Sequence, residues 1–147
     1  MFGEIANSGS GPALEAAFRF AAQRQKVILH NVANSTTPNF VQSDVSIPKF
    51  QQMLRGAIDE RRTQGSLGEL NLKSTDELEL DPGQSESGQF TLRPKTPHGG
   101  IMFHDRNNRS TELLMKDLVE NGTMFRVVSD LLKSRSDVLR TAISERL

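Results

Sequence analysis

The sequence predicts a mainly α-helical protein whose N- and C-terminal helices pair as an antiparallel coiled coil, with a poorly ordered or short-β insertion between them. Near both ends of the 147-residue chain, apolar residues recur in alternating steps of four and three. The middle of the chain is rich in Gly, Pro and small polar residues. Two helices at opposite ends of a chain most simply pair with each other, and because the chain leaves and returns, the pairing is antiparallel.

The N-terminal helix is expected to begin around Gly11 and Pro12, because proline suits the first helical position, where its missing N–H costs no hydrogen bond. It is expected to end near Asn34, before a Ser-Thr-Thr-Pro turn. Its heptad seam has one polar interruption and consists of Leu14, Phe18, Ala21, Gln25, Ile28 and Val32. Further apolar residues lie off this seam, which predicts more than one buried side.

The C-terminal helix is expected to run from about residue 110 to 145, with Ser110 or Thr111 capping its start. Such a helix is roughly 54 Å long and needs a partner along its length. Its seam is Leu114, Leu118, Asn121, Phe125, Val128, Leu132, Arg135, Leu139 and Ala142. Asn121 and Arg135 interrupt it, and polar residues at such positions lower stability but fix register or partner number.

The middle of the chain predicts little regular structure. Ile47, Phe50 and Leu54 suggest one or two amphipathic turns, and residues 70–72, 77–80 and 90–92 alternate apolar with polar residues as short strands do. On such a strand Glu77 and Glu79 would face solvent, and the pair Arg61 and Arg62 is expected on a solvated face. Between residues 56 and 109 lie seven Gly and three Pro, which favours a poorly packed insertion.

These patterns divide the chain into a flexible N-terminus at residues 1–10, a helical core domain formed by residues 11–54 and 107–147, and a flexible or small β-containing insertion at residues 55–106. The composition agrees with an extended shape. Hydrophobic residues make up 35% of the chain, or about 42% with Gly included, against roughly 45–50% in an average globular protein.

Charge and cysteine content exclude several function classes. Eighteen basic residues balance eighteen acidic ones, so the chain has no general attraction for nucleic acid or an anionic membrane. There is no Cys, which removes disulfides and thiolate metal sites. The first residues have no basic or long apolar stretch of a cleaved signal, and no run of 18 apolar residues predicts a membrane span.

Catalytic and metal-binding hypotheses find little support in the pattern. His98, His104 and Asp105 are a conceivable metal cluster, but their spacing matches no helical ligand pair. His30 lies off the helix seam and is expected to be a surface residue. The sequence therefore predicts no enzyme, no catalytic residue, no metal and no cofactor.

The segment that follows the first helix carries a specific motif. Residues 31–40 read NVANSTTPNF, with Asn31, Ala33, Asn34, Thr37, Pro38 and Phe40 as its matching positions. They resemble the N-x-A-N-x-x-T-P-G-Y segment of flagellar rod, hook and hook-associated proteins. Asn39 stands at the family's Gly and Phe40 at its Tyr. Both changes are mild, since Asn tolerates a left-handed backbone and Phe keeps the ring.

The C-terminal helix resembles the same family independently. Asn107 and Asn108 precede Met115, Leu118, Asn121, Phe125 and Leu132 at the spacing of the family's N-N-V-D…E-M…L…N…Y…L-L pattern. Arg109, Ser110 and Leu114 depart from that pattern. The resemblance covers about residues 11–54 and 107–145, and the short insertion is most similar to that of proximal rod members.

The resemblance implies a structural rod subunit that is exported unfolded, without cleavage, through the flagellar type III channel. Its implied location is the periplasmic part of the basal body. The implied partners are further copies, other rod proteins, the adaptor between membrane ring and rod, and the export apparatus. A cytoplasmic coiled-coil adaptor or secretion chaperone is the alternative, because it would use the same seams without needing the turn at residues 31–40.

Overall fold

A computed structural model describes residues 10–63, 70–80, 90–96 and 110–144. Within them the chain runs through α2 (Gly11–Ala33), α3 (Ile47–Thr63), β1 (Leu78–Leu80), β2 (Phe90–Leu92) and α4 (Thr111–Ser144). The fold is mainly α with a small antiparallel sheet in the middle of the chain, as the sequence predicts.

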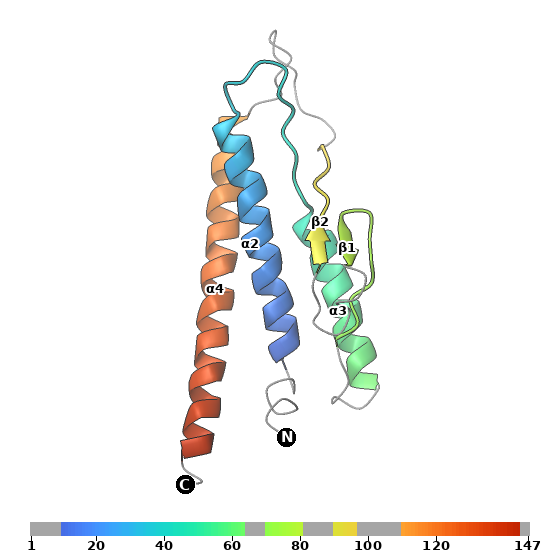
Figure 1. Cartoon of the computed structure of the whole chain (residues 1–147), viewed down its shortest axis with the longest axis vertical. Helices are drawn as coiled ribbons and strands as arrows, with labels where there is room; N and C mark the ends of the chain where they lie inside the picture. The colour runs from blue at the N-terminus through green and yellow to red at the C-terminus, as the bar shows by residue number, and fades with distance from the viewer. Residues whose placement is uncertain (1–9, 64–69, 81–89, 97–109, 145–147) are drawn as a thin grey trace.

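The terminal helices α2 and α4 lie side by side and run in opposite directions (Figure 1). Their contacts follow one register: Gln25 meets Asn121, Phe18 meets Phe125, and Ser10 meets Arg135. Each step toward the start of α2 is thus matched by a step toward the end of α4. The predicted antiparallel pairing is confirmed.

The helix limits agree with the expected signals. Pro12 lies in the first turn of α2, and the backbone carbonyl of Ser10 accepts the N–H of Leu14 at 3.0 Å. Helix α4 begins directly after Ser110, whose hydroxyl oxygen accepts the N–H of Leu113 at 3.4 Å. Alanines recur along α2, and because alanine has the highest helix propensity and a small side chain, they both favour the helix and allow its neighbours to approach closely.

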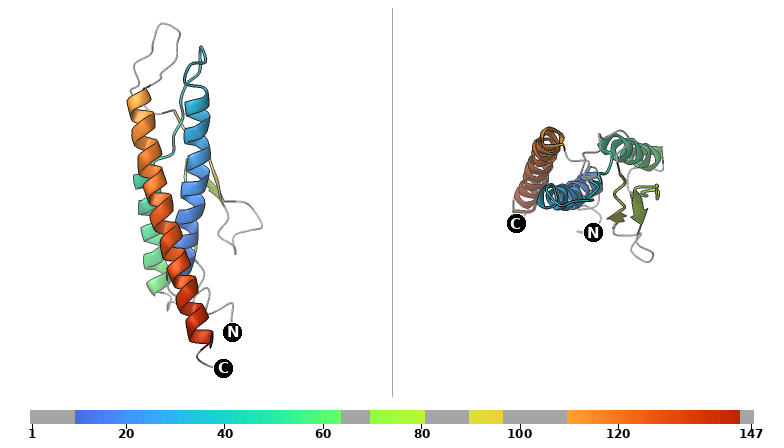
Figure 2. Two further views of the ribbon diagram at one scale, coloured as in Figure 1. Left: turned by 90° about the vertical axis from the view of Figure 1, so that its left-hand side faces the viewer. Right: turned by 90° about the horizontal axis from the view of Figure 1, so that it is seen from above.

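A second layer packs on the other side of α2. Seen from above, α2 lies between α4 and the layer formed by α3 and the two strands (Figure 2). Three aromatic rings join this layer to α2: Phe20 stacks on Phe50 with ring centroids 3.9 Å apart, and the ring centroids of Phe50 and Phe90 lie 6.2 Å apart. The core of the molecule is therefore shared between the terminal helices and the middle of the chain.

The expectation of a poorly packed middle is wrong for the residues that the structure describes. The apolar side chains of Leu70, Leu72, Leu78, Phe90 and Leu92 are all at most 8% exposed. Each apolar segment is too short for its periodicity to predict this burial. The surface that covers it comes from α2 and α3, which lie elsewhere in the sequence. Residues 77–80 and 90–92 contain the strands, whereas residues 70–72 form no strand.

Helix α3 is also longer than predicted. In place of one or two turns it has 17 residues, and the expected domain limit at residue 54 lies inside it. Its buried face follows the same four-three spacing through Phe50, Leu54, Ala57 and Arg61. Residues 59–63 are all polar, so the sequence does not predict that the buried face continues through them. Arg61 is 6% exposed, so its assignment to a solvated surface is wrong, whereas Arg62 is exposed.

Glu77 is the second polar residue assigned to the wrong environment. It precedes β1 and is 7% exposed, and its carboxylate accepts the backbone N–H of Ser46 at 2.8 Å and pairs with Lys49. It thereby binds the start of α3 from a distant part of the chain. Glu79, on β1, is exposed and pairs with Arg93, as predicted for a solvated strand position.

Candidate assembly surface

The turn after α2 is held by its own polar side chains. Asn34 donates from its backbone N–H and its side-chain amide to the carbonyl of His30, at 3.1 and 2.9 Å. Thr37 donates its backbone N–H to the carbonyl of Asn34 at 3.0 Å, and Ser35 donates its hydroxyl to the carbonyl of Val32 at 2.8 Å. Short-range hydrogen bonds therefore hold the turn. Ala33 and Pro38 are exposed in it.

Two residues of the motif have individual geometry. Asn39 has a φ of 60°, in the left-handed region that its position opposite a family glycine predicts. The ring of Phe40 packs edge-on against the ring of His30, with centroids 5.5 Å apart. His30 itself is exposed on α2, as expected.

Asn31 acts over a longer distance. It is 4% exposed, donates its side-chain amide to the carbonyl of Ser43 at 2.6 Å, and accepts the N–H of Ser43 at 3.2 Å. Its side chain therefore pairs with the backbone of residues 41–46, the return segment, as a neighbouring strand would. Gln23 does the same for β2, donating to the carbonyl of Phe90 at 2.6 Å and accepting the N–H of Leu92 at 3.0 Å.

The inner seam joins α4 to α2. Leu114, Asn121 and Val128 are the buried residues of α4, one every seven positions, and Ile28 is the most deeply buried apolar seam residue of α2 after Ala21. Leu14, Phe18, Leu118 and Leu132 are half-buried along the same seam. The ring centroids of Phe18 and Phe125 lie 4.8 Å apart. Most of the predicted seam residues thus meet between the two helices, whereas Val32 at the end of α2 is 37% exposed.

Helix α4 has a second apolar face, which the described residues cover less than they cover the inner seam. We name it the outer stripe. Its four members are 49–65% exposed and are Leu113, Val127, Leu131 and Val138. Their spacings of 14, 4 and 7 place them within about 40° of one another at roughly 100° per residue. Met115, predicted from the family pattern, lies outside both faces and is 54% exposed.

The last part of α4 extends past the described start of α2. Arg135 donates to the hydroxyl of Ser10 at 3.3 Å, and Ser10 is the first residue that the structure describes. Residues 136–144 continue for about 13 Å at 1.5 Å per residue. The seam positions Leu139 and Ala142 therefore meet no α2 residue within the described part of the chain.

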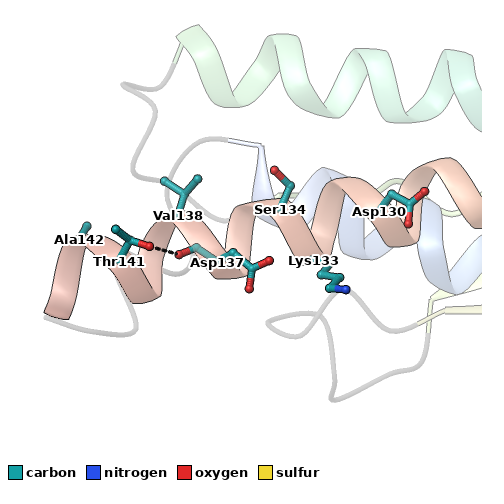
Figure 3. Close-up of a pocket in the computed structure, with 7 residues that line it drawn as sticks. All are labelled: Asp130, Lys133, Ser134, Asp137, Val138, Thr141 and Ala142. Carbon is teal, nitrogen blue, oxygen red and sulfur yellow. Dashed lines mark hydrogen bonds between the residues drawn. The ribbon is translucent and has the colours of Figure 1, made fainter.

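A hollow of about 590 Å³ lies along this end of the helix (Figure 3). All of its described lining residues come from α4: Asp130, Lys133, Ser134, Asp137, Val138, Thr141 and Ala142. One member of the outer stripe, Val138, is among them, flanked by charged and hydroxyl groups. Five of the seven described lining residues carry a charge or a hydroxyl group, and Val138 and Ala142 are the apolar ones.

A buried charge cluster was missed by the sequence analysis. The side chain of Arg24 on α2 is 3% exposed, and it donates from Nε and Nη2 to the two carboxylate oxygens of Asp44 at 3.0 and 2.8 Å. The same Nη2 lies 3.5 Å from Oδ1 of Asp117 on α4. The cluster joins α2, the return segment and α4. No spacing signals it, because its three members are far apart in the sequence.

Burial and neighbouring charges shift two groups of this cluster in the same direction. Burial opposes the charged form of Arg24, but the hydrogen bond and charge of Asp44 outweigh it and raise the pKa of the guanidinium. Burial also raises the pKa of Asp117, and the charges of Asp44 and Glu120 add to this effect against Arg24 and Lys116. Asp117 is thus the member of the cluster whose ionised form is disfavoured by its surroundings.

Neither a metal site nor a membrane span is found among the described residues. No group of three or more His, Cys, Asp or Glu side chains in residues 10–63, 70–80, 90–96 and 110–144 lies close enough to hold a metal ion. No helix in this part of the chain is long and apolar enough to cross a bilayer. His98, His104 and Asp105 lie outside the described residues, as do Asn107 and Asn108.

Comparison with known proteins gives one informative similarity. The chain is 29% identical over 110 residues to the flagellar basal body rod protein FlgB of Borrelia hermsii, an alignment that covers 74% of this chain and 76% of that protein. No family model matches the chain. The similarity confirms the resemblance to flagellar rod proteins that the two motifs predict, and that relative is a rod protein and not an enzyme.

Proposed function

We propose that this chain is a structural, non-enzymatic subunit of the bacterial flagellar basal-body rod, in its proximal part, and that it assembles through its terminal helices. The similarity to FlgB of Borrelia hermsii over about three quarters of both chains supports the structural role in the rod. One observation carries the mode of assembly: α4 buries its inner seam against α2 while its outer stripe stays exposed.

The outer stripe is the surface proposed to contact neighbouring subunits. Val127, Leu131 and Val138 are spaced by four and seven residues on α4, so a helix of another subunit can pack along this part of the stripe. Exposed apolar surface arranged in this way marks interaction sites more often than chance exposure does. The partners proposed for it are further copies and the other rod proteins.

The motif residues have a proposed role of a different kind. Asn31, Asn34 and Thr37 fix the direction in which the chain leaves α2, and Asn31 attaches the return segment to that helix. We propose that they set the angle between the helical pair and the layer of α3 and the sheet. That angle determines which surfaces of neighbouring subunits meet.

Export and location belong to the same proposal. The subunit is proposed to pass unfolded through the flagellar type III channel without cleavage, to meet the adaptor between membrane ring and rod, and to reside in the periplasmic part of the basal body. The absence of Cys agrees with threading, because no disulfide can cross-link the chain before passage. A cytoplasmic adaptor or secretion chaperone would instead stay inside the cell.

The test is a deletion combined with fractionation in the source bacterium. We expect the deletion strain to be non-motile and to lack rods and hooks by electron microscopy, and a tagged chain expressed from a plasmid to restore motility and co-purify with basal bodies. An intact amino terminus on the chain recovered from basal bodies would support export without cleavage. Recovery of a functional tagged chain in the cytoplasmic fraction, and its absence from basal bodies, would contradict the proposal.

A further inference from the structure

Arg24 connects three parts of the molecule that are separate in the sequence. Its guanidinium holds Asp44 of the return segment through two hydrogen bonds and lies 3.5 Å from Asp117 of α4. The side chain is 3% exposed, and its Nη1 has no hydrogen-bond partner among the described residues. One cation is thus shared between two carboxylates at the junction of the helical pair and the second layer.

Three carboxylates act on the single guanidinium of Arg24: those of Asp44, Asp117 and Glu120. Asp44 takes both well-aligned hydrogen bonds, which leaves Asp117 with a longer contact and a side chain 27% exposed toward solvent. Glu120 adds a further negative charge one turn along α4. The charges of Asp44 and Glu120 oppose the ionised form of Asp117, and a partly buried carboxylate that receives incomplete compensation opposes folding.

Solvent reaches the cluster from one side of the molecule. It lines a groove of about 840 Å³ between α2, α4, the return segment and the start of α3. The charged neighbours of Asp117 come from three elements. They are Arg24 on α2, Asp44 in the return segment, and Lys116 and Glu120 on α4 itself. The remaining charged groups that line this groove are Lys49, Glu77 and Lys95.

We propose that Arg24, Asp44 and Asp117 form a proton-sensitive clasp, in which Arg24 holds the return segment through Asp44 and the charge on Asp117 weakens the contact between α2 and α4 until that carboxyl is protonated. The clasp concerns the fold of a single chain, so it stands whether or not the chain is a rod subunit. It makes the pairing of the terminal helices tighter in mildly acidic than in neutral solution.

The direction of the pKa shift supports this reading of the geometry. Burial, with the charges of Asp44 and Glu120, raises the pKa of Asp117 above its unfolded value. A carboxyl with a raised folded pKa penalises the fold above that pKa, and the penalty fades as the pH falls toward the ordinary value of about 3.9. Removing the charge should therefore stabilise the chain at neutral pH and have no effect in acid.

Thermal unfolding of the full chain as a function of pH tests the clasp. We expect Asp117→Asn to raise the melting temperature by about 2–4 °C at pH 7.5, the shift of a single electrostatic contact in a chain of this size, and to lose this advantage by about pH 4. The matched control is Asp130→Asn, an exposed position on the same helix, which should show no such pH dependence. A lower melting temperature for Asp117→Asn at pH 7.5, or a gain independent of pH, would overturn the proposal.

Carboxyl NMR gives a second measurement that does not depend on a stable Asp117 variant. In the unmodified chain the carboxyl of Asp117 should titrate above about 3.9. In Asp44→Asn, Arg24 has a single carboxylate partner, so the midpoint of Asp117 should fall. A purely structural role for Asp44 would not move that midpoint downward. A midpoint at or below about 3.9 in the unmodified chain, or one unchanged by Asp44→Asn, would refute the shared clasp.

Discussion

The side-chain amide of Asn121 on α4 donates a hydrogen bond of 2.7 Å to Oε1 of Gln25 on α2. The polar interruption in one heptad seam therefore meets the polar interruption in the other. The same amide donates to the carbonyl of Ala21 at 3.0 Å, and Asn121 is fully buried. Sliding α4 along α2 would separate these groups and leave them buried among apolar side chains, so the pair fixes the register of the helices.

The contribution of this pair can be measured by truncation. Asn121→Ala should lower the free energy of unfolding by about 1–3 kcal/mol, because Gln25 and the carbonyl of Ala21 lose their buried donor. Urea denaturation of the purified chain gives the value. Thr123→Ala, an exposed position two residues away, is the matched control and should change stability by about 0.5 kcal/mol or less. Equal effects of the two substitutions would show that the buried amide has no special role.

The left-handed residue in the turn gives a second prediction. Asn39 has a φ of 60°, a conformation that glycine adopts without cost and that β-branched residues avoid. Asn39→Gly should leave the melting temperature nearly unchanged, whereas Asn39→Val should lower the free energy of unfolding by about 1–2 kcal/mol. Because residue 39 is exposed, lost packing cannot explain a difference between the two variants. Similar stability of both variants would contradict the assigned backbone conformation.

The terminal helices could be predicted because their signals are local and repeated. The seam through Phe18, Gln25 and Ile28 spans several turns, so each turn adds weight to the same interpretation. Capping and turn residues such as Pro12 and Asn34 then place the limits within a residue or two. The match between Gln25 and Asn121 does not follow from the pattern alone, because Arg135 interrupts the α4 seam at the same distance from its centre as Asn121 does.

The middle of the chain could not be predicted for the opposite reason. Phe50 and Phe90 are buried by each other and by Phe20, which comes from another part of the sequence, so their short local patterns do not show that the three rings pack together. Arg24 and Glu77 look like ordinary surface charges until the fold supplies their partners. The motif residue Asn31 pairs with the backbone of Ser43, a contact that its place in the motif does not reveal.

Glu77 leads to a prediction with the opposite pH dependence from that of Asp117. Burial opposes its ionised form, but the hydrogen bonds from Lys49 and the backbone of Ser46 outweigh burial and lower the pKa of Glu77. A lowered folded pKa means that the contribution to stability is present above the ordinary value of about 4.3 and is lost as the pH falls through the folded value. Glu77→Gln should therefore cost about 1–3 kcal/mol at pH 7 and progressively less below about pH 4.

The measurement is urea denaturation of the unmodified chain and Glu77→Gln between pH 3 and pH 8. Glu79→Gln provides the control, because Glu79 is exposed on β1 and its pair with Arg93 is a surface ion pair worth about 1 kcal/mol at most. A cost of Glu77→Gln that stayed constant down to pH 3 would mean that its hydrogen bonds do not require the ionised carboxylate.

The outer stripe allows assembly to be separated from folding. Phe125→Asp or Leu132→Asp should abolish incorporation into the rod, but both side chains contact the inner seam, so loss of function there also reflects a damaged fold. Leu131→Asp and Val138→Asp place the charge on exposed positions instead. We expect them to change the free energy of unfolding by no more than about 1 kcal/mol and still to abolish motility and co-purification with basal bodies.

Arg126→Asp is the matched control for these stripe variants. Residue 126 is exposed on α4 and lies about 120–140° around the helix from Leu131 and Val138, so the same side chain is introduced away from the outer stripe. A folded Arg126→Asp chain should still enter the rod. If Leu131→Asp and Val138→Asp chains were folded and incorporated as well as the control, the neighbouring subunits would have to contact a different face, because a carboxylate buried against an apolar helix without a partner costs several kcal/mol.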